Sequence, residues 1–199
     1  MEVIPRNVFS VLPRQRLSRD FRESLRGFMA RNADLHFRYI SPARRDKYMR
    51  RAWKGKAILS WYEKSTFDKL KTNLFMLTVL HEEGGYWIDA HRSLQEPIIN
   101  LHDPDDEACL VISEDFSLIA DIPTHAYETQ LTHHNLSTWF LGFVPRHNLL
   151  ATSIESFLEI APYFDRHSVW SLGRATQALA GGGLLTRSLR QAMRNQSKL

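Results

Sequence analysis

The stretch "HEEGGYWIDAH" at residues 81–91 joins an apolar, aromatic-rich run to side chains that can do chemistry. The run ends on Asp89, and His91 follows two positions later. Residues two apart in an extended segment point to the same side, so a carboxylate and an imidazole would lie together. Both are ligands for Mn²⁺ or Mg²⁺, with water and a diphosphate completing the shell. The alternative interpretation of Asp89 is a strand-end carboxylate that caps a turn.

The residues before Asp89 predict the elements that would position it. Residues 66–83 carry apolar side chains at helical spacing and beyond it, which indicates a mostly buried helix. Gly84 and Gly85 would end this helix, because glycine takes the left-handed conformation without a steric penalty. A strand at 86–89 would follow at once. Since ligands bind beyond the carboxyl ends of strands in open α/β sheets, the sequence predicts that Asp89 lies at a ligand-binding edge.

The remaining pattern alternates strands with helices, which favours an α/β fold with a largely parallel sheet. Tyr86 and Trp87 are interpreted as core residues of the central strand. Further strands are expected at 3–12, 35–41, 108–113 and 137–145; helices at 18–31, 44–53, 147–160 and 172–180; and a short segment at 58–64. A hinge at Gly181, Gly182 and Gly183 would precede a basic amphipathic segment. We therefore expect one domain at 1–180 and a basic helical tail at 181–199.

Composition places the chain among ordinary globular proteins. It has 199 residues, of which 43% are hydrophobic and 24% charged. The opening "MEVIPRNVFSVLPRQR" lacks the unbroken apolar stretch of a signal peptide, and no run approaches the ~20 apolar residues of a membrane span. The single cysteine, Cys109, excludes an internal disulfide and is expected to be buried and inert. These features predict a cytoplasmic protein.

Charge is distributed unevenly along the chain. Residues 1–56 hold 15 Lys/Arg against 5 Asp/Glu, residues 57–165 hold 5 against 17, and residues 166–199 hold 6 against none. Basic ends around an acidic middle suit an anionic partner such as a nucleotide diphosphate or an anionic membrane surface. Solvated helix faces are the alternative. No nucleic-acid-binding motif accompanies the basic residues, so a nucleic-acid partner is not expected.

One block has the order and spacing of a known enzyme family. The segment "KTNLFMLTVLHEEGGYWIDAHRSLQEPI" (71–98) resembles the core of glycosyltransferase family 32, whose members carry a DxD motif. "VIPRNVFSVL" (3–12) is similar to the family's opening strand. "STWFLGFVPRHNLL" (137–150) and "PYFDRHSVW" (162–170) are similar to segments of its capsular-polysaccharide-synthesis branch. The resemblance covers about residues 3–180, and the Gly-Gly-to-Asp block is its specific part.

The resemblance implies a type A glycosyltransferase fold, which is a Rossmann-like α/β domain. It also implies a nucleotide-diphosphate-sugar donor, a glycan or lipid-linked acceptor, and a divalent ion that neutralises the departing diphosphate. Asp89 and His91 are then the expected metal ligands. Asn73, Asp89 and Phe9 are the expected donor-binding residues, and Glu83, Trp139 and His167 are weaker candidates. No catalytic residue is singled out.

Three positions depart from the family pattern. The family's aspartate that serves the donor sugar is Asn73 here, the arginine that follows it is Met76, and the second DxD aspartate is His91. Asn73 can still hydrogen-bond a hydroxyl, whereas Met76 offers neither charge nor donor. The sequence therefore leaves two functions open: a glycosyltransferase, or a non-catalytic relative that binds a sugar or a partner transferase.

Overall fold

A mixed β-sheet forms the centre of the protein. The computed structural model describes residues 3–12, 18–90, 92, 94–113, 135–165, 176 and 178–196. Five strands within these ranges pair in the order β2-β1-β3-β5-β4. Their bounds are β1 Asn7–Val11, β2 His36–Ile40, β3 Gly85–Ile88, β4 Ala108–Ser113 and β5 Asn135–Phe143. β1 runs parallel to β2 and β3, as predicted, but β5 lies antiparallel between β3 and β4.

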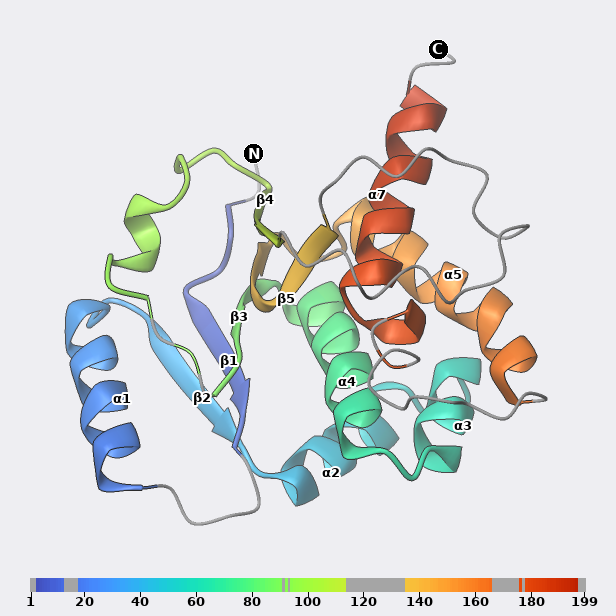
Figure 1. The fold of residues 1–199 in the computed structure, drawn as a ribbon, viewed down its shortest axis with the longest axis horizontal. Coiled ribbons are helices and arrows are strands. Elements are labelled where there is room, and N and C mark those ends of the chain that lie inside the picture. Colours follow the sequence, from blue (N-terminus) through green and yellow to red (C-terminus); the bar gives the residue numbers. More distant parts are fainter. Residues whose placement is uncertain are drawn as a thin grey trace.

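Helices cover both faces of this sheet (Figure 1). α1 lies on one face, and α2 to α5 and α7 lie on the other. The bounds are α1 Arg19–Arg31, α2 Pro42–Ala52, α3 Ala57–Lys64, α4 Asp68–Glu83, α5 Asn148–Asp165 and α7 Gly182–Gln196, with a short 3₁₀ turn η1 at Ile98–Asn100. Ser18 caps α1 as expected, its hydroxyl accepting a hydrogen bond from the Phe21 N–H at 3.2 Å.

Covering both faces explains why the central strand is apolar throughout. Tyr86 packs into the hydrophobic cluster beside α1, and Trp87 packs into the larger cluster beneath α4 and α5. Strand alternation sends the two side chains to opposite faces, so each finds its own core. The prediction that both are core residues is confirmed.

The glycine triplet is not the hinge that the sequence predicted. Gly182 and Gly183 form the first turn of α7, and the Leu185 N–H donates to the Gly181 carbonyl at 3.2 Å. Leu184 and Leu185 are fully buried in the larger core cluster. Burial of these leucines stabilises the helical conformation despite the low helix propensity of glycine.

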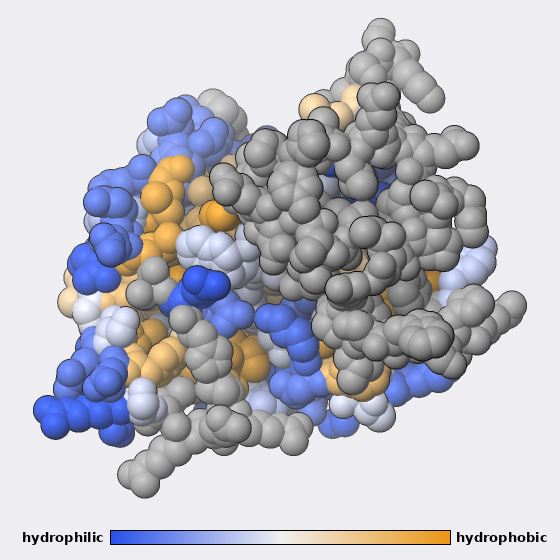
Figure 2. Space-filling model, in the orientation of Figure 1, coloured by the Kyte–Doolittle hydropathy of each residue, from blue (hydrophilic) through white to orange (hydrophobic). Residues whose placement is uncertain are grey.

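The surface seen in the orientation of Figure 1 carries both hydrophilic and hydrophobic residues. Figure 2 shows hydrophilic residues on α1 and on the stretch after η1, with an apolar strip between them. Ile99 and Leu101 are among the large hydrophobic side chains exposed to solvent. Among the described residues, no helix has both the length and the apolar character needed to cross a membrane.

The junction between α4 and β3 is made by two glycines without any loop. Gly84 has φ 62° and ends α4, its N–H donating to the Leu80 carbonyl at 2.9 Å. Gly85 has φ 100° and begins β3 directly. A Cβ at Gly85 would lie 2.5 Å from the Asn7 carbonyl oxygen on β1. Both positive φ and close approach therefore require glycine here.

Gly85→Ala should destabilise the fold, because alanine is strained at this φ and its Cβ collides with β1. We expect the free energy of unfolding to fall by about 2 kcal/mol or more, as measured by urea denaturation. Gly27→Ala is the matched control: Gly27 lies inside α1 with no crowded neighbour, so alanine should stabilise by about 0.5–1 kcal/mol. Equal effects of the two substitutions would contradict this account of the junction.

Candidate functional site

Asp89 follows β3 immediately, at the carboxyl edge of the sheet. Its N–H donates to the Trp139 carbonyl on β5 at 2.7 Å, and its own carbonyl accepts from the Arg92 N–H at 2.9 Å. These bonds hold the backbone on both sides of the residue. The Asp89 side chain is 28% exposed, so its carboxylate remains accessible from solvent. The predicted placement of Asp89 at a strand end is therefore confirmed.

Lys69 brings a positive charge to this carboxylate. Its Nζ lies 3.3 Å from Asp89 Oδ2, and it belongs to the first turn of α4. The pairing follows from topology, because α4 leads directly into β3 and the strand runs antiparallel to the helix. The first turn of the helix must then lie near the end of the strand. The Lys69 side chain is 54% exposed, so solvent reaches the pair.

Asn73 lies one helical turn deeper than Lys69, on the same face of α4. It is only 2% exposed, and its Nδ2 has no hydrogen-bond partner within the described part of the chain. Measured from Gly84, Asn73 lies roughly 16 Å along the helix and Asp89 roughly 16 Å along the strand, which places the two at similar heights. An unpaired buried amide costs about 1–3 kcal/mol, and a bound ligand would remove this cost.

A buried arginine fixes the first turn of α4. The Arg45 side chain, only 1% exposed, donates to Asp68 Oδ1 at 3.0 Å and to Thr72 Oγ1 at 2.8 Å. It also donates to Asp46 Oδ1 at 3.1 Å and to the Tyr62 hydroxyl at 2.9 Å. These bonds join α2, α3 and α4. Asp68 and Thr72 flank Lys69 in the chain, so the network holds the backbone from which Lys69 extends.

The network also sets the charge states of its members. Burial alone would raise the pKa of Asp46, but the hydrogen bond from Tyr62 and the charge of Arg45 outweigh it and hold that pKa below its usual range. Burial and the bond to Asp46 raise the pKa of Tyr62 well above that of a free phenol. Asp46 is therefore ionised and Tyr62 is neutral at physiological pH. The cluster is a compensated ion pair and not an acid–base pair.

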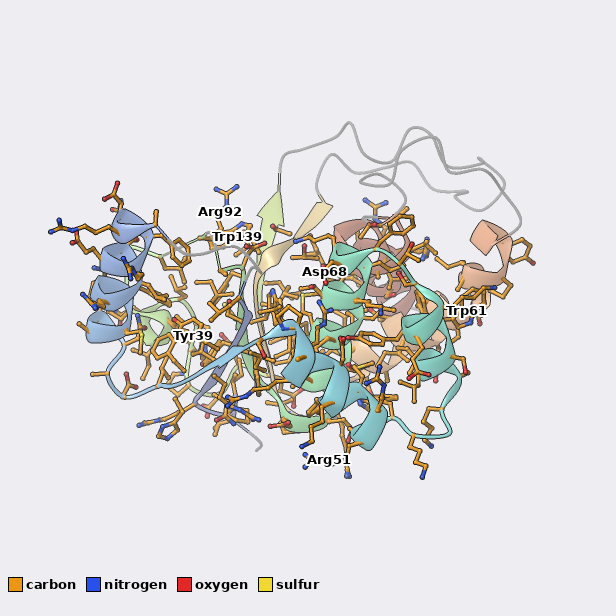
Figure 3. The ribbon with its side chains drawn as sticks, turned by 90° about the horizontal axis from the view of Figure 1, so that it is seen from below. Tyr39, Arg51, Trp61, Asp68, Arg92 and Trp139 are labelled. Carbon is orange, nitrogen blue, oxygen red and sulfur yellow. The ribbon has the colours of Figure 1, made fainter. Side chains whose placement is uncertain are left out.

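Arg92 adds a second cation to the edge. Its backbone bonds to Asp89, and its side chain is exposed. Figure 3 shows Arg92 pointing away from the sheet beside Trp139, with Asp68 at the first turn of α4. Arg92 is thus a second cationic residue close to Asp89 in the chain, in addition to Lys69.

The structure does not bring every predicted site residue to this edge. Trp139 is half-buried and adjoins Asp89 through its carbonyl. Phe9 is fully buried in the core, with the Arg38 guanidinium 4.7 Å from its ring centroid, so its ring has no surface for a donor. Glu83 pairs with Arg38 at the other end of α4, roughly 20 Å from Lys69. His91 and His167 lie outside the described residues.

Lys69 and Arg45 were missed by reasoning from the sequence. Lys69 could have been found, because it precedes Asn73 by four residues and so shares its helical face. Combined with the direct helix-to-strand turn, that spacing points Lys69 at Asp89. Arg45 offered no such signal, since it sits within a run of basic residues that looks like a solvated helix face.

The expected divalent ion does not fit the described residues as a complete site. They contain no group of three or more His, Cys, Asp or Glu residues placed to hold a metal. Asp89 supplies one carboxylate, and Lys69 already occupies one of its oxygens. The second expected ligand, His91, lies outside the described residues. The Mn²⁺ (or Mg²⁺) site at Asp89 and His91 thus stays a prediction.

Comparison with known proteins supports the fold. No protein-family model matches the chain, and no curated protein does. One similar solved structure is the PaToxG glycosyltransferase, with a TM-score of 0.70 and 13% sequence identity over 97% of this chain and 71% of that chain. This likeness confirms the predicted α/β, Rossmann-like glycosyltransferase fold. The assignment to family 32 and its capsular branch remains a prediction.

Arg45→Met should destabilise the protein, because it leaves Asp46, Asp68 and Tyr62 without their shared donor. We expect a loss of about 2–4 kcal/mol at neutral pH by urea denaturation. The lowered pKa of Asp46 stabilises the fold only above the ordinary carboxyl value, and this part is lost as pH falls through the lowered pKa. The deficit of the variant should therefore shrink below about pH 4.

Arg51→Met is the control for this measurement, since Arg51 is exposed on the same helix (Figure 3). Its effect should stay within about 0.5 kcal/mol at every pH. A similar loss in both variants would show that the Arg45 network does not hold α4.

Proposed function

We propose that the protein is a glycosyltransferase that moves a sugar from a nucleotide-diphosphate donor to a glycan or lipid-linked acceptor. The observation that carries this proposal is Asp89, an accessible carboxylate at the end of the central strand of a glycosyltransferase-type sheet. The carboxyl edge is where open α/β sheets bind ligands. A carboxylate there can accept hydrogen bonds from the hydroxyl groups of a sugar.

The reaction breaks the bond between the anomeric carbon and the diphosphate oxygen. The acceptor hydroxyl forms a new bond to that carbon and loses its proton, while the nucleotide diphosphate leaves with the bonding electrons. Asn73 would present its unpaired amide to a donor hydroxyl at the height of Asp89. Binding would thereby satisfy the Asn73 Nδ2, which has no partner within the described part of the chain.

A second function is favoured by Met76. This residue stands where the family has an arginine, and it is fully buried in the larger core cluster. Its side chain therefore packs and cannot contact a donor. A non-catalytic relative that binds a sugar nucleotide or a partner transferase is consistent with that loss. Contact of the basic ends with an anionic membrane remains a prediction from charge alone.

A nucleotide panel tests the primary proposal. UDP, GDP, ADP and their sugar conjugates should be compared in Mn²⁺ and in EDTA by thermal shift. We expect at least one nucleotide to raise the melting temperature by several degrees at saturation, because a ligand that binds only the folded state stabilises it by mass action. Asp89→Asn should abolish most of this shift while leaving the unliganded melting temperature nearly unchanged.

The exposed Asp105→Asn variant controls for loss of one surface charge and should behave as wild type. Slow release of free sugar from the bound conjugate by the wild type, and not by Asp89→Asn, would separate a transferase from a binding protein. If no nucleotide shifts the melting temperature in either buffer, the proposed function is wrong.

Asn73→Leu should separate stability from binding. Leucine has a similar size but no polar atoms. In the absence of ligand, the free energy of unfolding of the variant should therefore be about 1 kcal/mol higher than that of wild type. The same change removes the amide proposed to contact the donor, and affinity for the sugar conjugate should fall at least tenfold. Calorimetric titration with a conjugate and with its free nucleotide measures both effects. A variant that binds the conjugate as tightly as wild type would exclude Asn73 from the site.

A further inference from the structure

The carboxyl edge of the sheet already contains the positive charge that a diphosphate needs. Lys69 Nζ lies 3.3 Å from Asp89 Oδ2, and the exposed Arg92 follows Asp89 closely in the chain. The ammonium group of Lys69 already holds an oxygen of the Asp89 carboxylate, the group that a divalent cation would need here. An exposed ammonium group attracts a dianionic group and repels a divalent cation.

We propose that Lys69 is a donor-binding residue whose ammonium group holds the diphosphate of the donor without a divalent ion. This inference rests on the proposed function and deepens it, since it names the group that recognises the phosphates. Asp89 then acts as the positioning residue that orients the lysine.

The geometry of Lys69 suits this role. An ammonium group has three N–H donors, and the bond to Asp89 uses one of them. The side chain is 54% exposed, so the others can reach a ligand that arrives from solvent. Lysine binds phosphate as a compact point charge and needs no bidentate geometry. Lys69 can thus contact Asp89 and a phosphate oxygen together.

The backbone beneath Lys69 is held rigidly. Arg45 bonds to Asp68 and Thr72 on either side of it, which fixes the first turn of α4. No side chain caps this end of α4, because the N-cap residue is Phe67. The partial positive charge of the helix N-terminus therefore adds to that of the ammonium group. The Asn73 Nδ2, unpaired within the described residues, lies one turn deeper and would give a bound ligand a second polar partner.

The same charge serves the chemical step. When the bond between the anomeric carbon and the diphosphate oxygen breaks, the departing diphosphate gains one negative charge. A cation already in place stabilises this charge as it develops. The acceptor hydroxyl supplies the new bond to the anomeric carbon and releases one proton, so the step balances with no further reactant.

A surface ion pair is the competing explanation of the contact. Exposed Lys–Asp pairs contribute little to stability, because solvent and salt screen them. If Lys69 does nothing more, its removal should not affect nucleotide binding.

The test measures binding of UDP and GDP in EDTA by calorimetric titration. We expect wild type to bind one of them without metal, with an affinity that weakens as salt increases. Lys69→Gln should weaken binding at least tenfold, and Lys69→Arg should keep most of it because the charge remains. Lys71→Gln is the matched control, since Lys71 lies two residues further along α4 with its Nζ 5.2 Å from the Tyr62 ring centroid. Circular dichroism verifies that each variant is folded.

The outcomes separate the inference from the proposed function. Binding in EDTA that falls in Lys69→Gln and not in Lys71→Gln supports the inference. Binding only in the presence of Mn²⁺, or equal binding by wild type and Lys69→Gln, overturns the inference and leaves the glycosyltransferase proposal intact. The absence of nucleotide binding to wild type in either buffer overturns both.

Discussion

The direct turn from α4 into β3 is the constraint on which the site depends. Gly84 and Gly85 reverse the chain with no intervening loop, and a Cβ at Gly85 would collide with β1. The helix and the strand must therefore run antiparallel and in contact. α4 ends at this turn and β3 begins there, so the first turn of α4 lies beside the carboxyl end of β3. The meeting of Lys69 with Asp89 is a consequence of this reversal.

Two unlike interactions keep α4 in that position. Its middle is buried by apolar contact, with eight consecutive buried residues from Asn73 to Leu80. Its first turn instead depends on Arg45, which is paired with Asp46 and Asp68. A buried ion-pair network adds little net stability over a set of apolar side chains that replaces all of its members, although removing one member alone is costly. The network specifies geometry, because each donor requires one acceptor. The apolar contacts thus determine the position of the helix on the sheet, and Arg45 determines the position of its first turn.

Much of the fold could be predicted from local pattern, and less of the site. The buried helix, the glycine turn and the strand that delivers Asp89 were predicted because each has its own signal in residues 66–89. The antiparallel insertion of β5 had no such local signal, because the direction of a strand is decided by pairing partners that are distant in the chain. Phe9 was placed in the site by resemblance, although its strand position puts it in the core. Asn73 was expected to bind the donor, and the spacing of residues in α4 did not reveal that tertiary packing buries it.

The departures from the family pattern become consistent once Lys69 is considered. An aspartate at position 73 would lie one helical turn from Lys69 and would compete with Asp89 for its ammonium group. Asparagine removes that competition, so the lysine is left to Asp89. Where the DxD pattern of the family that the sequence resembles has its second aspartate, this chain has His91, so the sequence after β3 carries one carboxylate fewer than that pattern. Each change makes a hard divalent cation a poorer occupant and an ammonium group a better one. Compared with the family pattern that the sequence resembles, both positions therefore favour Lys69 as the source of positive charge, which is the role proposed for it.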